Sequence, residues 1–223
     1  MKKKIKKLII FGSGTHAKIC LNEFLKIFEI KKIYFFNNVD DLSELKFLNK
    51  TIQVIKKFEV LKKKIDKKTY FFIGVGDNAK RKSIFNETLG ELGKLNWLKL
   101  VSKHTIIDKS VKIGDGSAVL PGVVINFKSI IGDHCIINTK CSIDHDCFVD
   151  NFVNISPGAN IAGNVIIGKE ARIGMGASIK EDLKIEENVS IGANSFANKN
   201  CKKNQTYLGL PAKAYSKKKK YKS

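Results

Sequence analysis

The chain has 223 residues, and its 41 Lys and Arg against 21 Asp and Glu give a formal net charge of +20 at pH 7. This length can hold one large or two small domains, and no apolar run reaches the roughly 18 residues of a membrane helix. The charge alone would suit nucleic acid, an anionic membrane surface or phosphorylated small ligands. However, the lysines are scattered and no nucleic-acid motif accompanies them.

Dense lysine runs occur only at residues 2–7, 62–64 and 217–220, and we expect the last to be a solvated, partly disordered tail. Five cysteines without framework spacing indicate a reducing cytosol. The lysine-rich start leads into a strand rather than a signal peptide. We therefore expect a cytoplasmic protein that neither inserts into a membrane nor binds nucleic acid.

The first half of the chain opens with a short apolar strand at residues 5–11. A glycine turn with the sequence GSGTH follows at residues 12–16, and an amphipathic helix continues through about Phe28. This order and the G-x-G-x-x-[GA] spacing are typical of a turn whose N–H groups hold a diphosphate at the helix start. The same spacing also occurs in turns with no ligand.

A second strand, at residues 32–36, ends at Asn37 and Asn38, where a NAD-binding fold would need an acid for the ribose hydroxyls. Residues 70–78 form another buried strand with a glycine turn, and a basic helix follows at about 79–92. The α/β pattern then stops after roughly 95 residues, which is enough for half of a dinucleotide fold. A mononucleotide or sugar nucleotide is therefore a better ligand prediction than NAD.

The second half of the chain repeats every six residues. After a joining strand at 94–102, an Ile or Val recurs at each of fifteen steps without any insertion. The series is Ile107, Ile113, Val119, Ile125, Ile131, Ile137, Ile143, Val149, Ile155, Ile161, Ile167, Ile173, Ile179, Ile185 and Ile191. A second series, two residues earlier in each step, runs from Thr105 to Val189 and is nearly all small or β-branched.

A period of six fits neither a helix nor a single strand, but it is typical of a hexapeptide β-solenoid. Three units of strand and turn close a triangular coil of about 18 residues, so the pattern predicts about five stacked coils. An ordinary sandwich would not keep one phase for so long. In five units a glycine follows the aliphatic residue, and there we expect a turn that needs positive φ. These are Gly114, Gly132, Gly168, Gly174 and Gly192.

One outward segment of the repeat, residues 143–147 with the sequence IDHDC, carries candidate chemistry. His145 lies two residues past an inward Ile, and one coil farther Gly163 should leave open space and an N–H beside the imidazole. A neutral His can deprotonate an attacking amine or hydroxyl, while Asp146 fixes its tautomer and the Gly163 N–H stabilises an oxyanion. The alternative is a surface His that is hydrogen-bonded to a neighbouring carboxylate.

Three segments, 142–147, 152–159 and 162–165, resemble the bacterial hexapeptide-repeat sugar acyltransferases. This is the sialic acid O-acetyltransferase and UDP-4-amino-sugar N-acetyltransferase family. The resemblance covers nearly the whole chain, including the N-terminal glycine turn and the closing G-x-P-A-K at 209–213. It implies a left-handed parallel β-helix and a homotrimer with acetyl-CoA bound between neighbouring prisms.

Together, the repeat and the resemblance divide the chain into three parts. Residues 1–102 form an α/β Rossmann-like half domain for the sugar nucleotide, and residues 103–200 form the β-helix that carries out acyl transfer. Residues 201–223 are a C-terminal segment with a basic tail.

The resemblance also implies roles for single residues. The general base maps to His145, the acid after it to Asp146, and the glycine one coil above to Gly163. Positions that bind the sugar nucleotide map to Gly14, Thr15, His16, Asn37, Asn38 and Gly76. Positions that contact acetyl-CoA map to Asn154, Met175 and Ala193, and no metal is implied.

Two positions depart from the family. Asn154 stands where the family usually has a second His. Its amide can donate a hydrogen bond to the acyl carbonyl but cannot titrate, so we expect an altered contact with the thioester. Asn37 and Asn38 replace a pair that is often acidic in the UDP-sugar enzymes. Amides can accept or donate, so the identity of the nucleobase stays open.

Three cysteines, Cys135, Cys141 and Cys147, fall on the three faces of one coil and point inward. They could hold a metal, but no fourth ligand is evident, and packing as small hydrophobic residues is the better interpretation. His104 and His134 have no partner pattern and are predicted to be surface residues.

We predict an acetyl-CoA-dependent enzyme that acetylates the amino group of a nucleotide-activated sugar for glycan synthesis. One alternative is O-acetylation of a sialic-type sugar, which keeps the base but needs no nucleotide pocket. Another is a non-catalytic sugar-nucleotide-binding protein. Asn154 favours that second alternative, whereas the intact His145–Asp146 pair argues against it.

Overall fold

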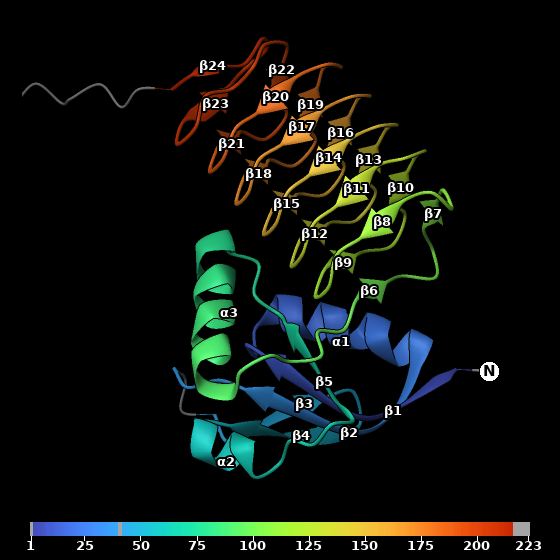
Figure 1. Cartoon of the computed structure of the whole chain (residues 1–223), viewed down its shortest axis with the longest axis vertical. Helices are drawn as coiled ribbons and strands as arrows, with labels where there is room; N and C mark the ends of the chain where they lie inside the picture. Colours follow the sequence, from blue (N-terminus) through green and yellow to red (C-terminus); the bar gives the residue numbers. More distant parts are fainter. Residues whose placement is uncertain (1, 40–41, 216–223) are drawn as a thin grey trace, which may run out of the picture.

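The computed structural model describes residues 2–39 and 42–215, so the lysine run at 217–220 lies outside the described residues. An α/β part and a prism of short strands are stacked along the long axis of the molecule (Figure 1). No helix within the described ranges is both long enough and apolar enough to span a membrane.

The N-terminal part is a five-stranded sheet in the order β3-β4-β2-β1-β5. Its strands are β1 (Lys3–Phe11), β2 (Phe28–Phe36), β3 (Glu44–Phe47), β4 (Lys50–Ile55) and β5 (Thr69–Ile73). The central strand β1 is parallel to both β2 and β5, and its last four residues are fully buried, as a strand covered on both faces requires. The antiparallel β3–β4 hairpin at the edge was not anticipated from the sequence.

Three helices cover this sheet: α1 (Thr15–Ile27), α2 (Phe58–Lys62) and α3 (Asn78–Leu92). The buried face of α1 includes Ala17, Leu21 and Phe24, which are spaced at three to four residues, as in an amphipathic helix. This face shares a core with Leu100 and Leu120, so α1 packs between the sheet and the first coil. Helix α3 packs on the sheet through Ile84 and Phe85, and its first turn reaches the prism (Figure 1).

The prism consists of two-residue strands on three sheets. The strands are β6 (Leu100–Val101), β7 (Ile106–Ile107), β8 (Lys112–Ile113), β9 (Ala118–Val119), β10 (Val124–Ile125), β11 (Ile130–Ile131), β12 (Ile136–Ile137), β13 (Ser142–Ile143), β14 (Phe148–Val149), β15 (Asn154–Ile155), β16 (Asn160–Ile161), β17 (Ile166–Ile167), β18 (Arg172–Ile173), β19 (Ser178–Ile179), β20 (Lys184–Ile185), β21 (Ser190–Ile191) and β22 (Phe196–Ala197). The three sheets have the orders β22-β19-β16-β13-β10-β7, β20-β17-β14-β11-β8 and β24-β23-β21-β18-β15-β12-β9-β6.

Every strand pairs in parallel with the strand one coil away. Val124, for example, pairs with Ser142 on one side and with Ile106 on the other. The predicted coil of three units is therefore confirmed. The far end is closed by β23 (Thr206–Leu208) and β24 (Lys213–Ala214), an antiparallel hairpin that covers the last open strand.

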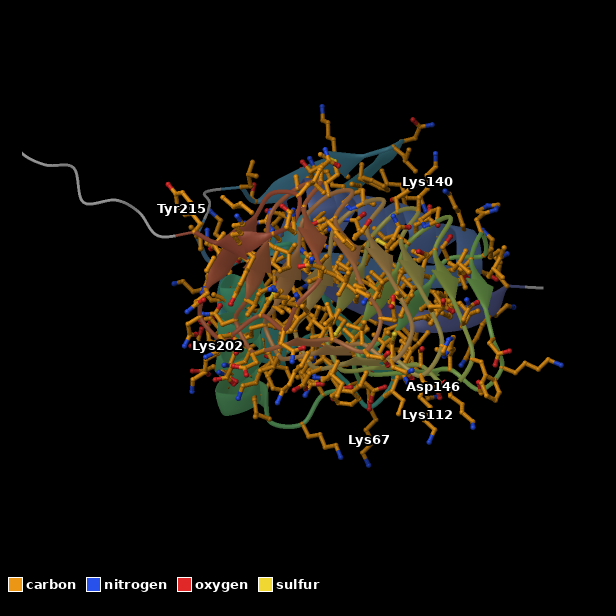
Figure 2. All side chains as sticks on the ribbon, turned by 90° about the horizontal axis from the view of Figure 1, so that it is seen from above. Lys67, Lys112, Lys140, Asp146, Lys202 and Tyr215 are labelled. Carbon is orange, nitrogen blue, oxygen red and sulfur yellow. The ribbon has the colours of Figure 1, made fainter. Side chains whose placement is uncertain are left out.

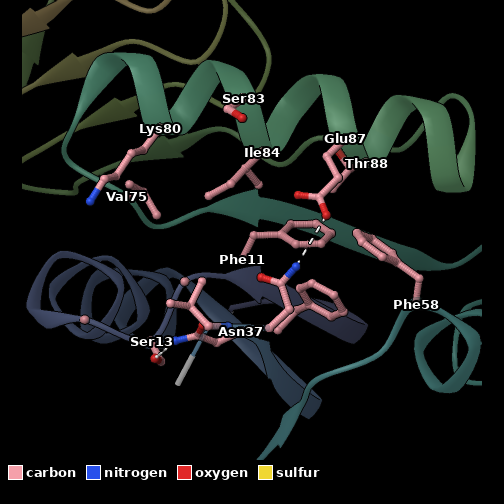
Figure 3. A pocket seen from close by; sticks show the side chains of 15 residues that line it. Phe11, Ser13, Asn37, Phe58, Val75, Lys80, Ser83, Ile84, Glu87 and Thr88 are labelled. Atoms are coloured by element: carbon pink, nitrogen blue, oxygen red, sulfur yellow. Dashed lines mark hydrogen bonds between the residues drawn. The ribbon is translucent and has the colours of Figure 1, made fainter. Parts of the chain in front are cut away.

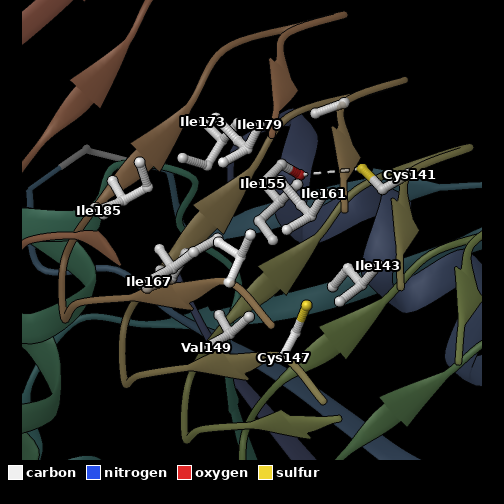
Figure 4. Close-up of a cluster of buried hydrophobic side chains, with 14 of the residues drawn as sticks. Cys141, Ile143, Cys147, Val149, Ile155, Ile161, Ile167, Ile173, Ile179 and Ile185 are labelled. Carbon is white, nitrogen blue, oxygen red and sulfur yellow. Dashed lines mark hydrogen bonds between the residues drawn. The ribbon is translucent and has the colours of Figure 1, made fainter. Parts of the chain in front are cut away.

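The two predicted residue series fill the axis of the prism (Figure 4). From Val119 to Ile191 the aliphatic series is buried, and only Ile107 and Ile113 at the first coil are partly exposed. Cys135, Cys141 and Cys147 are buried in the same core. Figure 4 shows the Cys141 thiol directed at the carbonyl of Ile155, at 3.5 Å.

The expectation for the glycines that follow the aliphatic residue was wrong. Positive φ occurs three residues after the aliphatic residue instead, at Gly158 but also at Phe152 and Asn164. The glycine directly after the aliphatic residue is needed because the next coil approaches closely. A Cβ at Gly168 would lie 2.6 Å from the backbone nitrogen of Glu187.

Candidate functional site

A pocket of about 640 Å³ opens at the carboxyl ends of the parallel strands, where open α/β sheets bind ligands (Figure 3). Its walls are the turn after β1, the end of β2 and one face of α3. The lining residues are Phe11, Gly12, Ser13, Gly14, Phe36, Asn37, Asn38, Val39, Phe58, Val75, Lys80, Ser83, Ile84, Glu87 and Thr88. Gly14, Asn37 and Asn38, all assigned to the substrate from the sequence, therefore face one cavity.

The fold requires a glycine at only one of the two glycine positions in the first turn. Gly12 has a φ of 89°, and a Cβ there would lie 2.7 Å from Val75 Cγ2, so the fold itself needs glycine. Gly14 has an ordinary φ of −74°, and a Cβ there would meet nothing within 4 Å. Gly14 also caps α1 without a side-chain hydrogen bond, so the first N–H groups of this helix suit an anion such as a phosphate.

The end of β2 presents its amides toward this pocket (Figure 3). Asn37 donates from Nδ2 to Ser13 Oγ at 2.7 Å, and Asn38 donates from Nδ2 to Glu87 Oε1 at 3.3 Å. Glu87 was missed from the sequence, although it lies on one helical face with Lys80, Ser83 and Ile84. The pocket thus contains a carboxylate after all, contributed by α3 rather than by β2.

Three other residues that were assigned to the substrate do not line this pocket. Thr15 is exposed at the start of α1, and Gly76 follows Val75 on the side of the prism. His16 is largely buried, with Nε2 3.6 Å from Cys20 Sγ. Burial, together with the positive charge of Arg81, lowers the pKa of His16 to about 4. Their roles in substrate binding stay predictions.

The predicted catalytic group lies at the corner between β13 and β14. His145 Nδ1 is 3.0 Å from Asp146 Oδ2, and both side chains are about half exposed. If Nδ1 carries the proton donated to Asp146, the lone pair is on Nε2. A Cβ at Gly163 would lie 2.7 Å from Nε2, so only glycine leaves room for the imidazole.

The main chain around this imidazole is fixed by the coil ladder. Ala162 N donates to Ile179 O and Asn164 N donates to His145 O, so the ladder uses the amides on either side of Gly163. Asp144 accepts from the His145 N–H and from Asn126 Nδ2, both at 2.9 Å. The Asn126 bond, followed by the His145 amide, lowers the pKa of Asp144.

A cavity of about 600 Å³ lies on the sheet next to this corner. Its lining residues are Asn126, Ser142, Asp144, Asn160, Ile161, Ala162, Ser178, Ile179, Lys180, Glu181 and Phe196. Most of its lining residues are polar, whereas Ile161 and Ile179 belong to the prism core, and the sequence analysis did not single out this cavity. Asp144 connects this cavity with the backbone of His145.

Two of the three residues assigned to acetyl-CoA line another cavity, of about 440 Å³. Met175 and Ala193 lie there at one corner of the prism, and the Met175 side chain is exposed. Asn154 is not in this cavity. Its Nδ2 donates to the carbonyl of Gly76 at 3.0 Å, at the contact between the prism and the α/β part.

The candidate catalytic and acetyl-CoA residues occupy different corners of the prism. His145 and Asp146 lie between β13 and β14, whereas Met175 and Ala193 follow β18 and β21. Figure 2 shows Asp146 and Lys140 at opposite edges, and Lys140 belongs to the same column of corners as Met175. Within one chain, these two groups of residues therefore do not meet.

The prediction that His134 is a surface residue was wrong, because α3 and the segment that follows it cover its corner. His134 is 2% exposed and stacks on Phe152, with ring centroids 5.3 Å apart and an interplanar angle of 8°. Phe85 and Trp97 enclose the other sides. Burial lowers the pKa of His134 to about 4, and Arg81 adds to this effect. His104, by contrast, is exposed as predicted.

The three thiols in one coil donate to main-chain carbonyls of the next coil. The partner of Cys135 is Asp150 O at 3.0 Å, and that of Cys147 is Ala162 O at 3.1 Å. Burial raises the pKa of Cys135 to about 12, which disfavours the thiolate that a metal would need. Across residues 2–39 and 42–215, no three His, Cys, Asp or Glu side chains gather as metal ligands.

Known proteins match both parts of the chain. The family model described as the PglD N-terminal domain matches residues 7–88. The acetyltransferase domain of PglB from Neisseria gonorrhoeae FA1090, solved in complex with acetyl coenzyme A, is 30% identical. That match has a TM-score of 0.82 and covers 95% of this chain and 100% of the other. The chain belongs to the family of hexapeptide-repeat sugar acetyltransferases.

Two more distant structures share the fold of this sugar acetyltransferase. PerB from Caulobacter crescentus, in complex with CoA and GDP-perosamine, is 24% identical, with a TM-score of 0.80 over 95% of this chain and 98% of that one. WeeI from Acinetobacter baumannii AYE is 22% identical, with a TM-score of 0.79 over 96% and 100%. A comparison with curated proteins gave no match.

These matches confirm three predictions for the sugar acetyltransferase. The resemblance to the family is confirmed, as is the enzyme class. The fold class is also confirmed: a Rossmann-like half domain is followed by a left-handed parallel β-helix.

Proposed function

We propose that this sugar acetyltransferase moves the acetyl group of acetyl-CoA to the amino group of a nucleotide-activated amino sugar. The observation that carries the proposal is the 3.0 Å contact between His145 Nδ1 and Asp146 Oδ2, which leaves Nε2 facing the Gly163 backbone. The PglB domain bound to acetyl coenzyme A and PerB bound to CoA and GDP-perosamine support the same chemistry.

The reaction is a direct transfer between two bound substrates. The amine nitrogen attacks the thioester carbonyl carbon, and His145 Nε2 takes the proton that the nitrogen loses. The tetrahedral intermediate then expels the CoA sulfur, and the imidazolium returns the proton to it. Asp146 holds Nδ1–H throughout and stabilises the positive charge of the imidazolium.

The negative charge on the carbonyl oxygen needs a fixed donor. The Gly163 N–H is suited to this role because the ladder between coils uses the amides of Ala162 and Asn164 instead. One such donor typically contributes about 10² to 10³ in rate. A glycine at this position serves both purposes, since it also leaves room for the imidazole.

The nucleotide part of the acceptor occupies the pocket at the glycine turn. Gly14 and the open N–H groups of α1 suit the diphosphate, while Asn37, Asn38 and Glu87 offer polar partners to the base and sugar. In this division of labour, residues 1–102 bind the sugar nucleotide and residues 103–200 carry out the transfer, while β23 and β24 close the prism. Free sialic-type sugars would leave this pocket unused, which disfavours the O-acetylation alternative.

A complete site requires more than one copy of the chain. Since His145 and the Met175–Ala193 cavity lie at different corners, acetyl-CoA bound along one prism reaches a His145 only on a neighbour. A closed ring of three prisms provides this arrangement at each interface, so the proposed assembly is a homotrimer. Five free cysteines, all buried, suit a reducing cytoplasm, where nucleotide sugars and acetyl-CoA are substrates.

Thiol release from acetyl-CoA tests the proposal and separates it from its alternatives. The acceptors are UDP-, GDP-, CMP- and dTDP-linked amino sugars, together with free sialic acid. The proposal expects release with at least one nucleotide-linked amino sugar. Release with free sialic acid alone would establish O-acetylation, and ligand binding without release would indicate a non-catalytic protein.

A further inference from the structure

Arg81 is the largest fully buried side chain of the described residues, at 1% exposure, and it lies between the α/β part and the prism. Its acceptors are main-chain carbonyls and one amide oxygen, Asn78 Oδ1 at 2.9 Å. No ion pair with a carboxylate is present for Arg81 among the described residues. Burial lowers the pKa of Arg81 to about 10.

A buried cation without an anionic partner is unfavourable unless its donors are satisfied by fixed acceptors. If packing were its only task, an apolar side chain of similar volume would serve as well or better. Arg81 must therefore contribute through the direction of its hydrogen bonds. A guanidinium carries five N–H donors in a rigid plane, so it can fix several carbonyls relative to one another.

The acceptors of Arg81 come from the two parts of the molecule. On the α/β side, Nη1 donates to Val75 O and Gly76 O, both at 3.1 Å. On the prism side, Nε donates to His134 O at 2.7 Å and Nη2 donates to Phe152 O at 2.8 Å. One planar group thus joins the turn after β5 to two successive coils.

The two closest prism carbonyls that accept from Arg81 are not used by the hydrogen-bond ladder between coils. The Phe152 N–H donates to Asp133 O, and the Glu170 N–H donates to Asn151 O. The ladder therefore uses the carbonyl of the residue that precedes each left-handed corner residue. The carbonyls of the corner residues themselves accept from α3. Glu170 O, one coil beyond Phe152, accepts from Asn78 Nδ2 at 3.0 Å. The first turn of α3 is therefore bonded to three consecutive coils.

The Gly76 carbonyl is held from a second direction. Asn154, on β15, donates from Nδ2 to Gly76 O at 3.0 Å, so this carbonyl accepts from Asn154 and from Arg81. The turn also borders the nucleotide pocket, because Val75 and Lys80 line that cavity. On neighbouring residues of α3, Lys80 thus faces the pocket and Arg81 faces the prism.

We propose that Arg81 is a positioning residue that ties the sugar-nucleotide turn to successive coils of the β-helix, with Asn154 as its second anchor. This pair sets the height along the prism at which the acceptor amine is presented. The inference rests on the proposed function of the pocket. It also assigns Asn154 a role in the acceptor half of the site, where the family resemblance had implied a contact with acetyl-CoA.

The test uses two variants of Arg81. Arg81→Lys keeps the positive charge but loses the planar guanidinium with its five N–H donors, and Arg81→Met keeps most of the side-chain volume. Asn154→Asp removes the second donor with little change in shape. The matched control is Lys82→Met, because Lys82 forms a partly exposed ion pair with Glu170 at 2.6 Å across the same contact, away from the turn. Such exposed pairs contribute little.

Two measurements are made on the whole 223-residue chain. Hydrogen–deuterium exchange follows the amides of residues 74–80, which needs no ligand. Kinetics with acetyl-CoA and a UDP-, GDP- or dTDP-linked amino sugar give KM and kcat for each substrate. We expect the Arg81 variants to exchange these amides about tenfold faster or more, while the amides of residues 119–191 stay protected. We expect kcat/KM for the amino sugar to fall about 10- to 100-fold, with acetyl-CoA affinity unchanged.

Asn154→Asp should give the same pattern to a smaller degree, and Lys82→Met should match the wild type. Wild-type exchange at residues 74–80 in Arg81→Lys would overturn the proposal, as would an equal loss of affinity for both substrates. If an Arg81 variant does not fold, Asn154→Asp decides by the same criteria. If the wild type acetylates none of the amino sugars, the proposed function fails, and the exchange data still decide whether Arg81 holds the turn.

Discussion

The imidazole of His145 lies against the backbone of Gly163, one coil farther along the prism. A Cβ at position 163 would come within 2.7 Å of both Nε2 and Cε1. The repeat makes this contact possible, because residues 18 positions apart in the chain are stacked as neighbours, as Asn126 and Asp144 are on the same corner. The six-residue repeat thus sets the position of His145 Nε2, the proposed general base.

Gly163→Ala should therefore impair catalysis without unfolding the protein. The new methyl group displaces the imidazole from its position beside Asp146, and we expect kcat to fall about 10- to 100-fold with little change in the KM for acetyl-CoA. Steady-state kinetics and thermal unfolding measure the two effects. Gly90→Ala in α3 is the control, since a Cβ there meets nothing within 4 Å and alanine favours a helix. An unchanged kcat in Gly163→Ala would exclude this placement of the imidazole.

The glycine turn offers a second comparison. Gly14→Val should raise the KM for the nucleotide sugar strongly while acetyl-CoA affinity and stability stay near wild type, because the open space at Gly14 faces the pocket. Gly12→Val should instead lose stability, because of its positive φ and its contact with Val75. Calorimetric titration and thermal unfolding separate the two variants. Equal sugar-nucleotide affinity in wild type and Gly14→Val would refute the assignment of the pocket.

Stability should decline as the pH falls from about 6.5 to about 4. His16 and His134 both have folded-state pKa values lowered to about 4, so in this window the unfolded chain binds more protons than the folded one. Their stabilising effect is complete above the unfolded pKa of about 6.5 and is lost as the pH falls. At about 1.4 kcal/mol per pKa unit, each of the two histidines contributes a few kcal/mol to the free energy of unfolding above pH 6.5.

Urea unfolding at several pH values measures the slope of the free energy of unfolding against pH. His134→Phe should flatten it, because phenylalanine can stack on Phe152 without a proton to bind, and Phe152 itself already occupies the same left-handed corner conformation. A His134→Phe variant with the full wild-type slope would contradict this account.

The sequence predicted the prism in detail, because each coil buries the same two side-chain positions and the period therefore appears directly in the residue pattern. It placed Gly163 beside His145 for the same reason. The buried site of His134 depends on Phe85 and Trp97, which come from distant parts of the chain, so no local pattern could indicate it. Glu87 was missed because a helix face shows its function only when the sheet beneath it is known.

The proposed homotrimer can be tested because the residues of one site should come from two different subunits. Light scattering should give a homotrimer of roughly 75 kDa, three times the chain mass of 24.9 kDa. If each site combines His145 of one subunit with the Met175–Ala193 cavity of another, mixed trimers of His145→Ala and Ala193→Trp chains should be more active than the trimers of either parent. A stable monomer that turns over, or mixed trimers without any recovery, would contradict the shared site.

The most direct measurement of the central claim is acetyl transfer by the wild type and by His145→Ala, followed by mass spectrometry of the sugar nucleotide. The account predicts that the wild type adds one acetyl group to the amine of a nucleotide-linked amino sugar. His145→Ala should lower kcat about 10²- to 10⁴-fold, with the KM for acetyl-CoA almost unchanged. Asp146→Asn should cost less, and Asp182→Asn, at the equivalent corner two coils farther, should cost nothing. A His145→Ala enzyme with wild-type kcat would contradict the account.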